Sequence, residues 1–283
     1  MNFHQKPNKF VSRVHLKVQH LERSLAFYQE VIGFKVLNRT AKAADLTADG
    51  RTVLLTVEQP DNVIPKQGRT TGLYHFALLL PSRQDLAGIV RHFAALNQRF
   101  GSSDHLVSEA LYLSDPDGNG IEVYADRDDA DWSWNGGQVE MAVDPLDFEN
   151  LLADGGQTEW QGLPPGTVMG HIHLHVSDLR AAEQFYTQGL GFEVVSRYGA
   201  QALFISAGRY HHHIGLNIWN GEGAPKPPNN SAGLSFYTLV LPDKEARERV
   251  IAKLQQLGAD LEIEEDSVFA ADPSGNRILL SIS

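Results

Sequence analysis

The segment RVHLKVQHLERSLAFYQEVIGFKVLNR (Arg13–Arg39) decides the fold, because the chain repeats it. It recurs as HIHLHVSDLRAAEQFYTQGLGFEVVSR (His171–Arg197), displaced by 158 positions throughout (13 to 171). Two further pairs follow in the same order: GLYHFALLLP (72–81) with GLSFYTLVLP (233–242), and DPDGNGIEV (115–123) with DPSGNRILL (272–280). The chain therefore consists of two homologous halves.

Each half divides again into two units with the same order of elements. Residues 13–18 alternate as a strand does, and residues 21–31 carry apolar side chains at helical spacing up to Gly33. Three further strands are expected at 34–39, 43–48 and 51–58, which gives a βαβββ unit. The second unit repeats this with a strand from Leu73, a helix over 84–97 and a strand over 120–125.

The pattern predicts an α+β chain of four βαβββ modules, at residues 10–58, 72–126, 169–220 and 233–283. We expect an N-terminal half over 1–126 and a C-terminal half over 169–283. Residues 127–168 are acidic and rich in Gly and Pro, and we expect a surface linker with one short helix over 145–153.

The composition narrows the class of protein. The 283 residues include no cysteine, which excludes disulfides, thiolate metal ligands and cysteine nucleophiles and favours a cytoplasmic protein. A net charge of −11 argues against nucleic acid and anionic membranes as partners. The chain contains no apolar run of membrane-spanning length and no secretory signal.

With these repeats, the chain resembles the vicinal-oxygen-chelate superfamily, which includes glyoxalase I, bleomycin-resistance proteins and extradiol ring-cleaving dioxygenases. The resemblance covers nearly the whole chain. It implies that the modules pair into cup-shaped mixed sheets, and that a cup holds a divalent metal through residues of the first and last strands of its modules.

The extradiol dioxygenases are the most similar branch. Their "GH" strand motif lies seven residues before the start of a helix, as His171 does before Asp178 and His75 before Ser82. Their carboxylate ligand follows a DPDGN turn, as Glu122 does here. The resemblance implies that His75, Glu122 and His171 form the two-histidine, one-carboxylate set typical of Fe(II), with Mn(II) as the alternative metal.

The other two units lack this set. Unit one has Arg13 at the ligand position, and unit four has Phe236 and Leu279 there. We therefore expect unit two to pair with unit three in one metal-binding cup, and unit one with unit four in a cup without metal. If unit one pairs with unit two instead, His15 becomes the missing ligand.

Two more residues match extradiol positions near the metal. Tyr112 lies ten residues before Glu122, and the resemblance implies that it hydrogen-bonds a substrate oxygen. His105 lies further upstream with a gap two residues shorter than usual, and would hold the substrate or the oxygen. The alternatives are an ordinary half-buried strand tyrosine and a loop histidine.

Three consecutive histidines, His211–His213, precede an apolar run. The context HHIG resembles the extradiol sequence around the acid–base histidine, which makes His212 the candidate. Strand alternation instead places His213 on the inward face, so the sequence leaves the two open. Imidazole suits this role because its ordinary pKa is near 6.5.

The resemblance implies an enzyme that cleaves a catechol or related dihydroxy-aromatic with O₂ to a 2-hydroxymuconic semialdehyde type of product. One alternative is a glyoxalase-like metal-dependent isomerase or lyase. The other is a non-catalytic protein that binds small aromatic compounds. The sequence leaves open the ring substituents, the metal and whether copies of the chain associate into a homo-oligomer.

Overall fold

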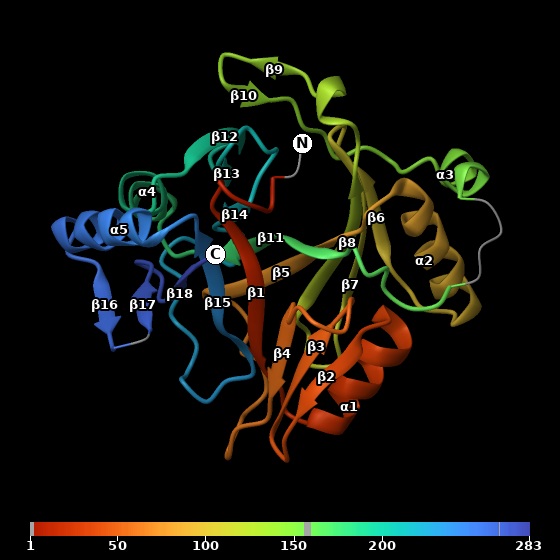
Figure 1. Cartoon of the computed structure of the whole chain (residues 1–283), viewed down its shortest axis with the longest axis horizontal. Helices are drawn as coiled ribbons and strands as arrows, with labels where there is room; N and C mark the ends of the chain where they lie inside the picture. The colour runs from red at the N-terminus through yellow and green to blue at the C-terminus, as the bar shows by residue number, and fades with distance from the viewer. Residues whose placement is uncertain (1–2, 156–159, 266) are drawn as a thin grey trace.

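The computed structural model describes residues 3–155, 160–265 and 267–283 (Figure 1). The helices of the described chain are α1 (Leu21–Ala26), α2 (Arg83–Ala95), α3 (Phe148–Asp154), α4 (Leu179–Gln184) and α5 (Lys244–Gln256). Two π-helical turns, η1 (Phe27–Ile32) and η3 (Phe185–Gly189), continue α1 and α4, and η2 (Asp129–Asp131) is a short 3-10 turn.

The strands of the N-terminal half are β1 (Phe10–Lys17), β2 (Lys35–Arg39), β3 (Ala43–Thr47), β4 (Leu55–Glu58), β5 (Gly72–Leu79), β6 (Gly101–Asp104), β7 (Ser108–Ser114) and β8 (Gly120–Asp126). Those that follow are β9 (Trp134–Asn135), β10 (Gln138–Val139), β11 (Val168–His175), β12 (Glu193–Tyr198), β13 (Ala202–Ser206), β14 (Ile214–Asn217), β15 (Gly233–Leu241), β16 (Asp260–Ile263), β17 (Val268–Ala271) and β18 (Arg277–Ile282).

The described strands form two eight-stranded mixed sheets, and each sheet takes one unit from each half. One runs β12-β13-β14-β11-β5-β8-β7-β6 and therefore joins unit three to unit two. The other runs β16-β17-β18-β15-β1-β4-β3-β2 and joins unit four to unit one. Figure 1 shows β1 beside β15 and β5 beside β11, the two antiparallel pairs that hold the halves together. The expected α+β fold of paired βαβββ units is confirmed, and the units pair as their histidines indicated.

Strand alternation separates the core from the site. In β11, Ile172 and Leu174 are fully buried in the main hydrophobic core, while His171 and His173 project from the opposite face. The core therefore fills the space between sheets and helices, and the concave face is left for polar side chains.

The helix expected over residues 21–31 changes character after Ala26. The chain continues as the π-turn η1 and ends at Gly33, whose φ of 91° lies in the left-handed region. A Cβ at Gly33 would lie 2.8 Å from the Cα of Gly162, so the residue is required to be small as well. The duplication preserves the wide turn in η3.

Two expected elements differ in extent. The strand expected over 51–58 begins only at Leu55, because the Asp49 carboxylate accepts the backbone N–H groups of Arg51 and Thr52 and holds a turn there. The short linker helix α3 starts later than expected, at Phe148, where the Asp147 side chain caps its first turn. The linker also forms the β9–β10 hairpin, which the sequence did not indicate.

None of the helices in the described part of the chain combines the length and apolarity of a transmembrane segment.

Candidate metal centre

Three neighbouring strands bring the expected ligands together. His75 (β5), Glu122 (β8) and His171 (β11) are all buried. Oε2 of Glu122 lies 3.0 Å from Nε2 of His75 and 3.1 Å from Nε2 of His171. One ligand atom from each residue lies within 4.8 Å of the others, and no second such cluster occurs among the described residues.

This spacing fits a divalent cation. Two ligand atoms at about 2.1 Å from a metal and at right angles to each other are about 3 Å apart. Nε2 of His75 makes no well-aligned hydrogen bond although it lies 3.0 Å from Glu122, and Nδ1 of His171 is buried without a hydrogen-bond partner. Both are costly for polar atoms in a protein interior. A cation between the three side chains would satisfy Nε2 of His75.

The protonation states also suit a metal. Burial, only partly offset by Glu122, lowers the pKa of His171 to about 4. Burial alone would raise the pKa of Glu122, but His171 and His75 hold it well below its usual value. At neutral pH the His171 imidazole is therefore neutral and the carboxylate is charged, and these are the forms that bind metals.

Tyr112 and His105 form a hydrogen-bonded pair beside this cluster. Nδ1 of His105 donates to the Ala142 carbonyl at 2.6 Å, so its Nε2 must accept from the Tyr112 hydroxyl, also at 2.6 Å. Tyr112 lies directly opposite Glu122 in the β7–β8 ladder. Burial and the charge of Glu122 raise the pKa of Tyr112 well above 10, so the phenol keeps its proton.

The histidine triplet is not part of a strand, contrary to the sequence prediction. Gly208 and Arg209 both have positive φ and turn the chain after β13, and β14 begins only at Ile214. His211–His213 therefore lie in a connecting loop, where alternation does not decide which way a side chain points.

The loop separates the two candidates for the acid–base role. The His212 ring centroid lies 4.0 Å from that of His171. His213 is buried away from the cluster, with Nδ1 3.2 Å from the Ser206 hydroxyl and Nε2 3.4 Å from the Phe3 carbonyl. Burial, then His171 and His211, lower the pKa of His212 well below 6.5, so this ring is neutral at neutral pH. The geometry thus favours His212 over His213.

The fold and the cluster agree with the comparison to protein families. The sequence model of the Glyoxalase/Bleomycin resistance protein/Dioxygenase superfamily matches residues 11–123 and again 168–280. The chain belongs to this superfamily.

Several named proteins are similar over most of the chain. A protein of Bacillus subtilis (strain 168) named catechol-2,3-dioxygenase is 50% identical over 265 residues, which is 91% of this chain and 92% of that protein. The solved structure of the cppA protein from Streptococcus pneumoniae superposes with a TM-score of 0.60 at 15% identity, covering 98% of this chain and 100% of that one. Glyoxalase I from Zea mays gives 0.57 at 16% identity, covering 96% and 92%. At these identities the two structures support the fold alone.

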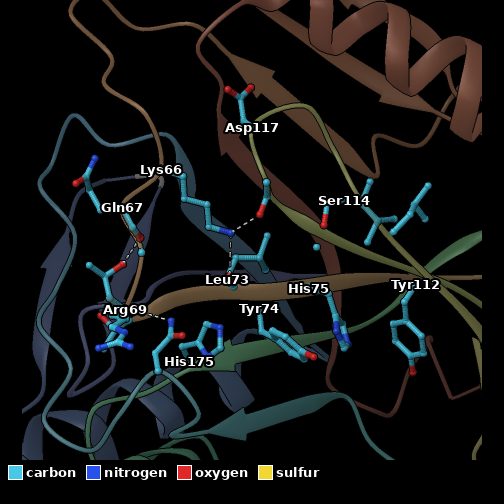
Figure 2. Close-up of a pocket in the computed structure, with 18 residues that line it drawn as sticks. Lys66, Gln67, Arg69, Leu73, Tyr74, His75, Tyr112, Ser114, Asp117 and His175 are labelled. Atoms are coloured by element: carbon cyan, nitrogen blue, oxygen red, sulfur yellow. Dashed lines mark hydrogen bonds between the residues drawn. The ribbon is translucent and has the colours of Figure 1, made fainter. Parts of the chain in front are cut away.

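A cavity of about 550 Å³ opens beside His75, the one residue of the cluster among those that line it (Figure 2). Figure 2 shows His75 and Tyr112 toward one end and Arg69 toward the other, with Tyr74 and His175 between them. Tyr74, which lines the cavity next to His75, is a residue that sequence reasoning missed.

A second group missed by sequence reasoning supports the histidines of β11. The amide of Asn217 donates to Nε2 of His173 at 3.0 Å, and its oxygen accepts from Nδ1 of His175 at 2.7 Å. The His173 ring packs flat on Gly215, where a Cβ would lie 2.8 Å from it. His173 and His175 alternate with Ile172 and Leu174 in β11, and the β11–β14 pairing brings Asn217 beside them.

In the sheet of units one and four, the polar side chains at the corresponding positions contact each other in pairs. Arg13 contacts Asp45 at 2.6 Å, and Nε2 of His15 lies 2.9 Å from Glu58. The Phe236 ring, at the position that corresponds to His75, packs at a tilt against His15 with ring centroids 4.7 Å apart. His15 therefore belongs to the sheet of units one and four, and the alternative in which it completes the metal site is wrong.

Proposed function

We propose that this chain is an Fe(II)-dependent extradiol dioxygenase of the cytoplasm. It opens the ring of a catechol or related dihydroxy-aromatic with O₂ and gives a 2-hydroxymuconic semialdehyde type of product. Mn(II) is the alternative metal. The observation that carries the proposal is the buried cluster of His75, Glu122 and His171, whose His75 lines a cavity together with Tyr112. The His212 ring packs against His171. The 50% identical relative named catechol-2,3-dioxygenase supports the same reaction.

The three ligands leave part of the metal's coordination shell to the substrate. His75, Glu122 and His171 would hold Fe(II), and the bound metal would supply Lewis-acid and electron-transfer chemistry for the dihydroxy-aromatic and O₂. The cavity beside His75 receives the ring, and its volume of about 550 Å³ is within the range of small-molecule sites.

His212 is the proton carrier in this proposal. Nε2 of His212 has no hydrogen-bond partner among the described residues, and the ring packs against His171. A neutral imidazole there can take a phenolic proton as the substrate binds and return it when the ring opens.

Tyr112 orients the substrate. Its own proton is held by Nε2 of His105, so its oxygen is free to accept a hydrogen bond from a catechol hydroxyl. His105 in turn is fixed by the Ala142 carbonyl, which places this residue in a supporting position behind Tyr112.

A turnover assay tests the proposal. Purified full-length protein, loaded anaerobically with ferrous iron, is mixed with air-saturated catechol while oxygen uptake and absorbance are recorded. We expect one O₂ consumed per catechol and a yellow product. The absence of ring cleavage with every simple catechol and hydroquinone overturns the proposal.

Two other functions predict different results. A glyoxalase-like isomerase typically uses two carboxylates on zinc or nickel, whereas Glu122 is the one carboxylate in this cluster. Activity with Zn(II) and insensitivity to air would favour that function. A protein that only binds aromatic compounds would keep its ligand affinity in His171→Ala, whereas the dioxygenase loses turnover.

A further inference from the structure

His212 hydrogen-bonds to a second histidine that the sequence did not assign to any role. Nδ1 of His212 lies 2.8 Å from Nδ1 of His211, and Nε2 of His211 lies 2.8 Å from Oδ1 of Asp126. Asp126 is the last residue of β8, four positions after Glu122 on the same strand. β8 thus carries both the ligand Glu122 and the carboxylate that contacts His211, the neighbour of the acid–base candidate His212.

The two short contacts allow one arrangement of protons in the neutral pair. A carboxylate only accepts hydrogen bonds, so Nε2 of His211 must carry a proton. In a neutral imidazole the other nitrogen is then an acceptor, so Nδ1 of His211 accepts from Nδ1–H of His212. Nε2 of His212, the nitrogen without a partner in the described chain, is left with a free lone pair.

We propose that His211 and Asp126 are positioning residues, which hold His212 in the Nδ1–H tautomer so that Nε2 can accept the substrate's proton. The opposite tautomer would present an N–H to the substrate and could not accept. This inference rests on the proposed function for its purpose, but the tautomer itself follows from the two hydrogen bonds.

The surroundings keep this pair in place. His211 is fully buried, its ring centroid is 4.1 Å from that of Tyr210, and it packs edge-on against Trp132 of the linker at 5.2 Å. The Tyr210 hydroxyl also donates to Asp126, at a longer 3.3 Å. The linker and the loop before the triplet therefore close over His211.

The other cup contains a matched pair that has no such role. His15 and Glu58 make a histidine–carboxylate contact of 2.9 Å, close to the 2.8 Å of His211 and Asp126, in the sheet without the metal-binding cluster. Glu58→Gln thus tests whether loss of a carboxylate beside a histidine affects the enzyme in general.

Nitrogen-15 NMR of the histidine rings reads the tautomer directly in the full-length protein. Zn(II), which has no unpaired electrons, replaces iron for this measurement. In the natural chain we expect the proton of His212 on Nδ1. In Asp126→Asn the new amide donates to Nε2 of His211, so Nδ1 of His211 carries the proton and donates to Nδ1 of His212. We then expect the proton of His212 on Nε2. We expect Glu58→Gln to leave the tautomer of His212 unchanged.

Turnover of catechol by the iron-loaded variants gives the second readout. We expect Asp126→Asn and His211→Leu to lower kcat by about 100-fold with little change in KM, in line with loss of acid–base catalysis. His211→Asn places an amide oxygen near the lost Nδ1 and should recover much of kcat. Glu58→Gln should retain the kcat of the natural chain.

The two readouts separate this inference from the proposed function. A His212 proton on Nε2 in the natural chain, or on Nδ1 in both the natural chain and Asp126→Asn, overturns the positioning role whatever the activity. If the tautomer reverses as expected while no catechol is cleaved by any form, the positioning role stands and the proposed function fails.

Discussion

The hydroxyl of Tyr112 lies 2.6 Å from Nε2 of His105, and this contact ties a residue of β7 to the loop that follows β6. The two were singled out separately in the sequence, and His105 had an irregular spacing. The contact accounts for the irregular spacing of His105, because in the proposed function this residue needs to reach only the Tyr112 phenol and not the substrate.

Replacing Tyr112 by Phe should lower kcat for catechol by about tenfold to hundredfold, since a hydrogen bond to a buried polar group contributes about 1–3 kcal/mol. Steady-state kinetics with the iron-loaded protein measures this. His105→Gln keeps an acceptor for the phenol and should be milder than His105→Leu. Equal rates in the two His105 variants would argue against the pairing of these residues.

Replacing His75 by Ala should abolish stoichiometric metal binding. Loss of a group that merely supports a ligand costs about 10–100-fold in metal affinity, so loss of a ligand costs more. Metal analysis after dialysis measures the bound iron. His15→Ala, in the other cup, is the control and should bind iron as the natural chain does; a loss of iron there would contradict the assignment.

Replacing Tyr28 by Phe should lower the free energy of unfolding by about 1–3 kcal/mol. The Tyr28 hydroxyl donates to the buried Asp115 carboxylate at 2.8 Å, and the duplicated pair Tyr186 and Asp272 repeats the contact at 3.1 Å. Urea unfolding measures the loss. Tyr198, which is 60% exposed, provides the control, because its change to Phe should be neutral.

The metal-free protein should lose stability as the pH falls from 6.5 toward 4. Burial lowers the pKa of His175 from 6.5 to about 4, ahead of the opposing effect of the hydrogen bond that His175 donates to the Asn217 oxygen. Between pH 4 and pH 6.5 the His175 imidazole is protonated in the unfolded chain but neutral in the folded chain. The free energy of unfolding therefore rises with pH across this window.

Urea unfolding at pH 7 and pH 5, with a chelator present, measures this dependence. His175 contributes at most about 3 kcal/mol, less for the part of the ring that solvent reaches. Because the pKa of buried His171, His173, His212 and His213 is lowered as well, His175→Asn should reduce the pH dependence without removing it. An unchanged slope in His175→Asn would mean that this ring does not contribute.

The spacing of residues along the sequence predicted the repeated units and the two faces of each strand. The repeat identified the four units, and the candidate ligands in units two and three indicated which units share a sheet. Alternation placed Ile172 toward the core and His171 toward the site, as the structure shows. The exact division into halves and linker stays a prediction.

The parts that the sequence did not reveal depend on contacts between distant segments or on backbone turns. The left-handed conformations of Gly208 and Arg209 removed the triplet from the strand, and a non-glycine residue such as Arg209 gives no signal of this. Asp126 meets His211 across 85 positions of sequence, so neither residue could be assigned a partner. The π-turns contain the buried Tyr28 and Tyr186, whose hydroxyls donate to the distant Asp115 and Asp272.

The exchange of units between the halves has a consequence for how the chain is made. Phe10 of β1 pairs with Val240 of β15, and β5 pairs with β11, so neither sheet is complete until the C-terminal half has left the ribosome. A nascent N-terminal half therefore carries two sheet edges, at β1 and β5, with unpaired backbone groups that other chains could bind. Such distant pairings also fold slowly. Synthesis of this protein thus includes an interval in which both sheets are incomplete and the edges of β1 and β5 are unpaired.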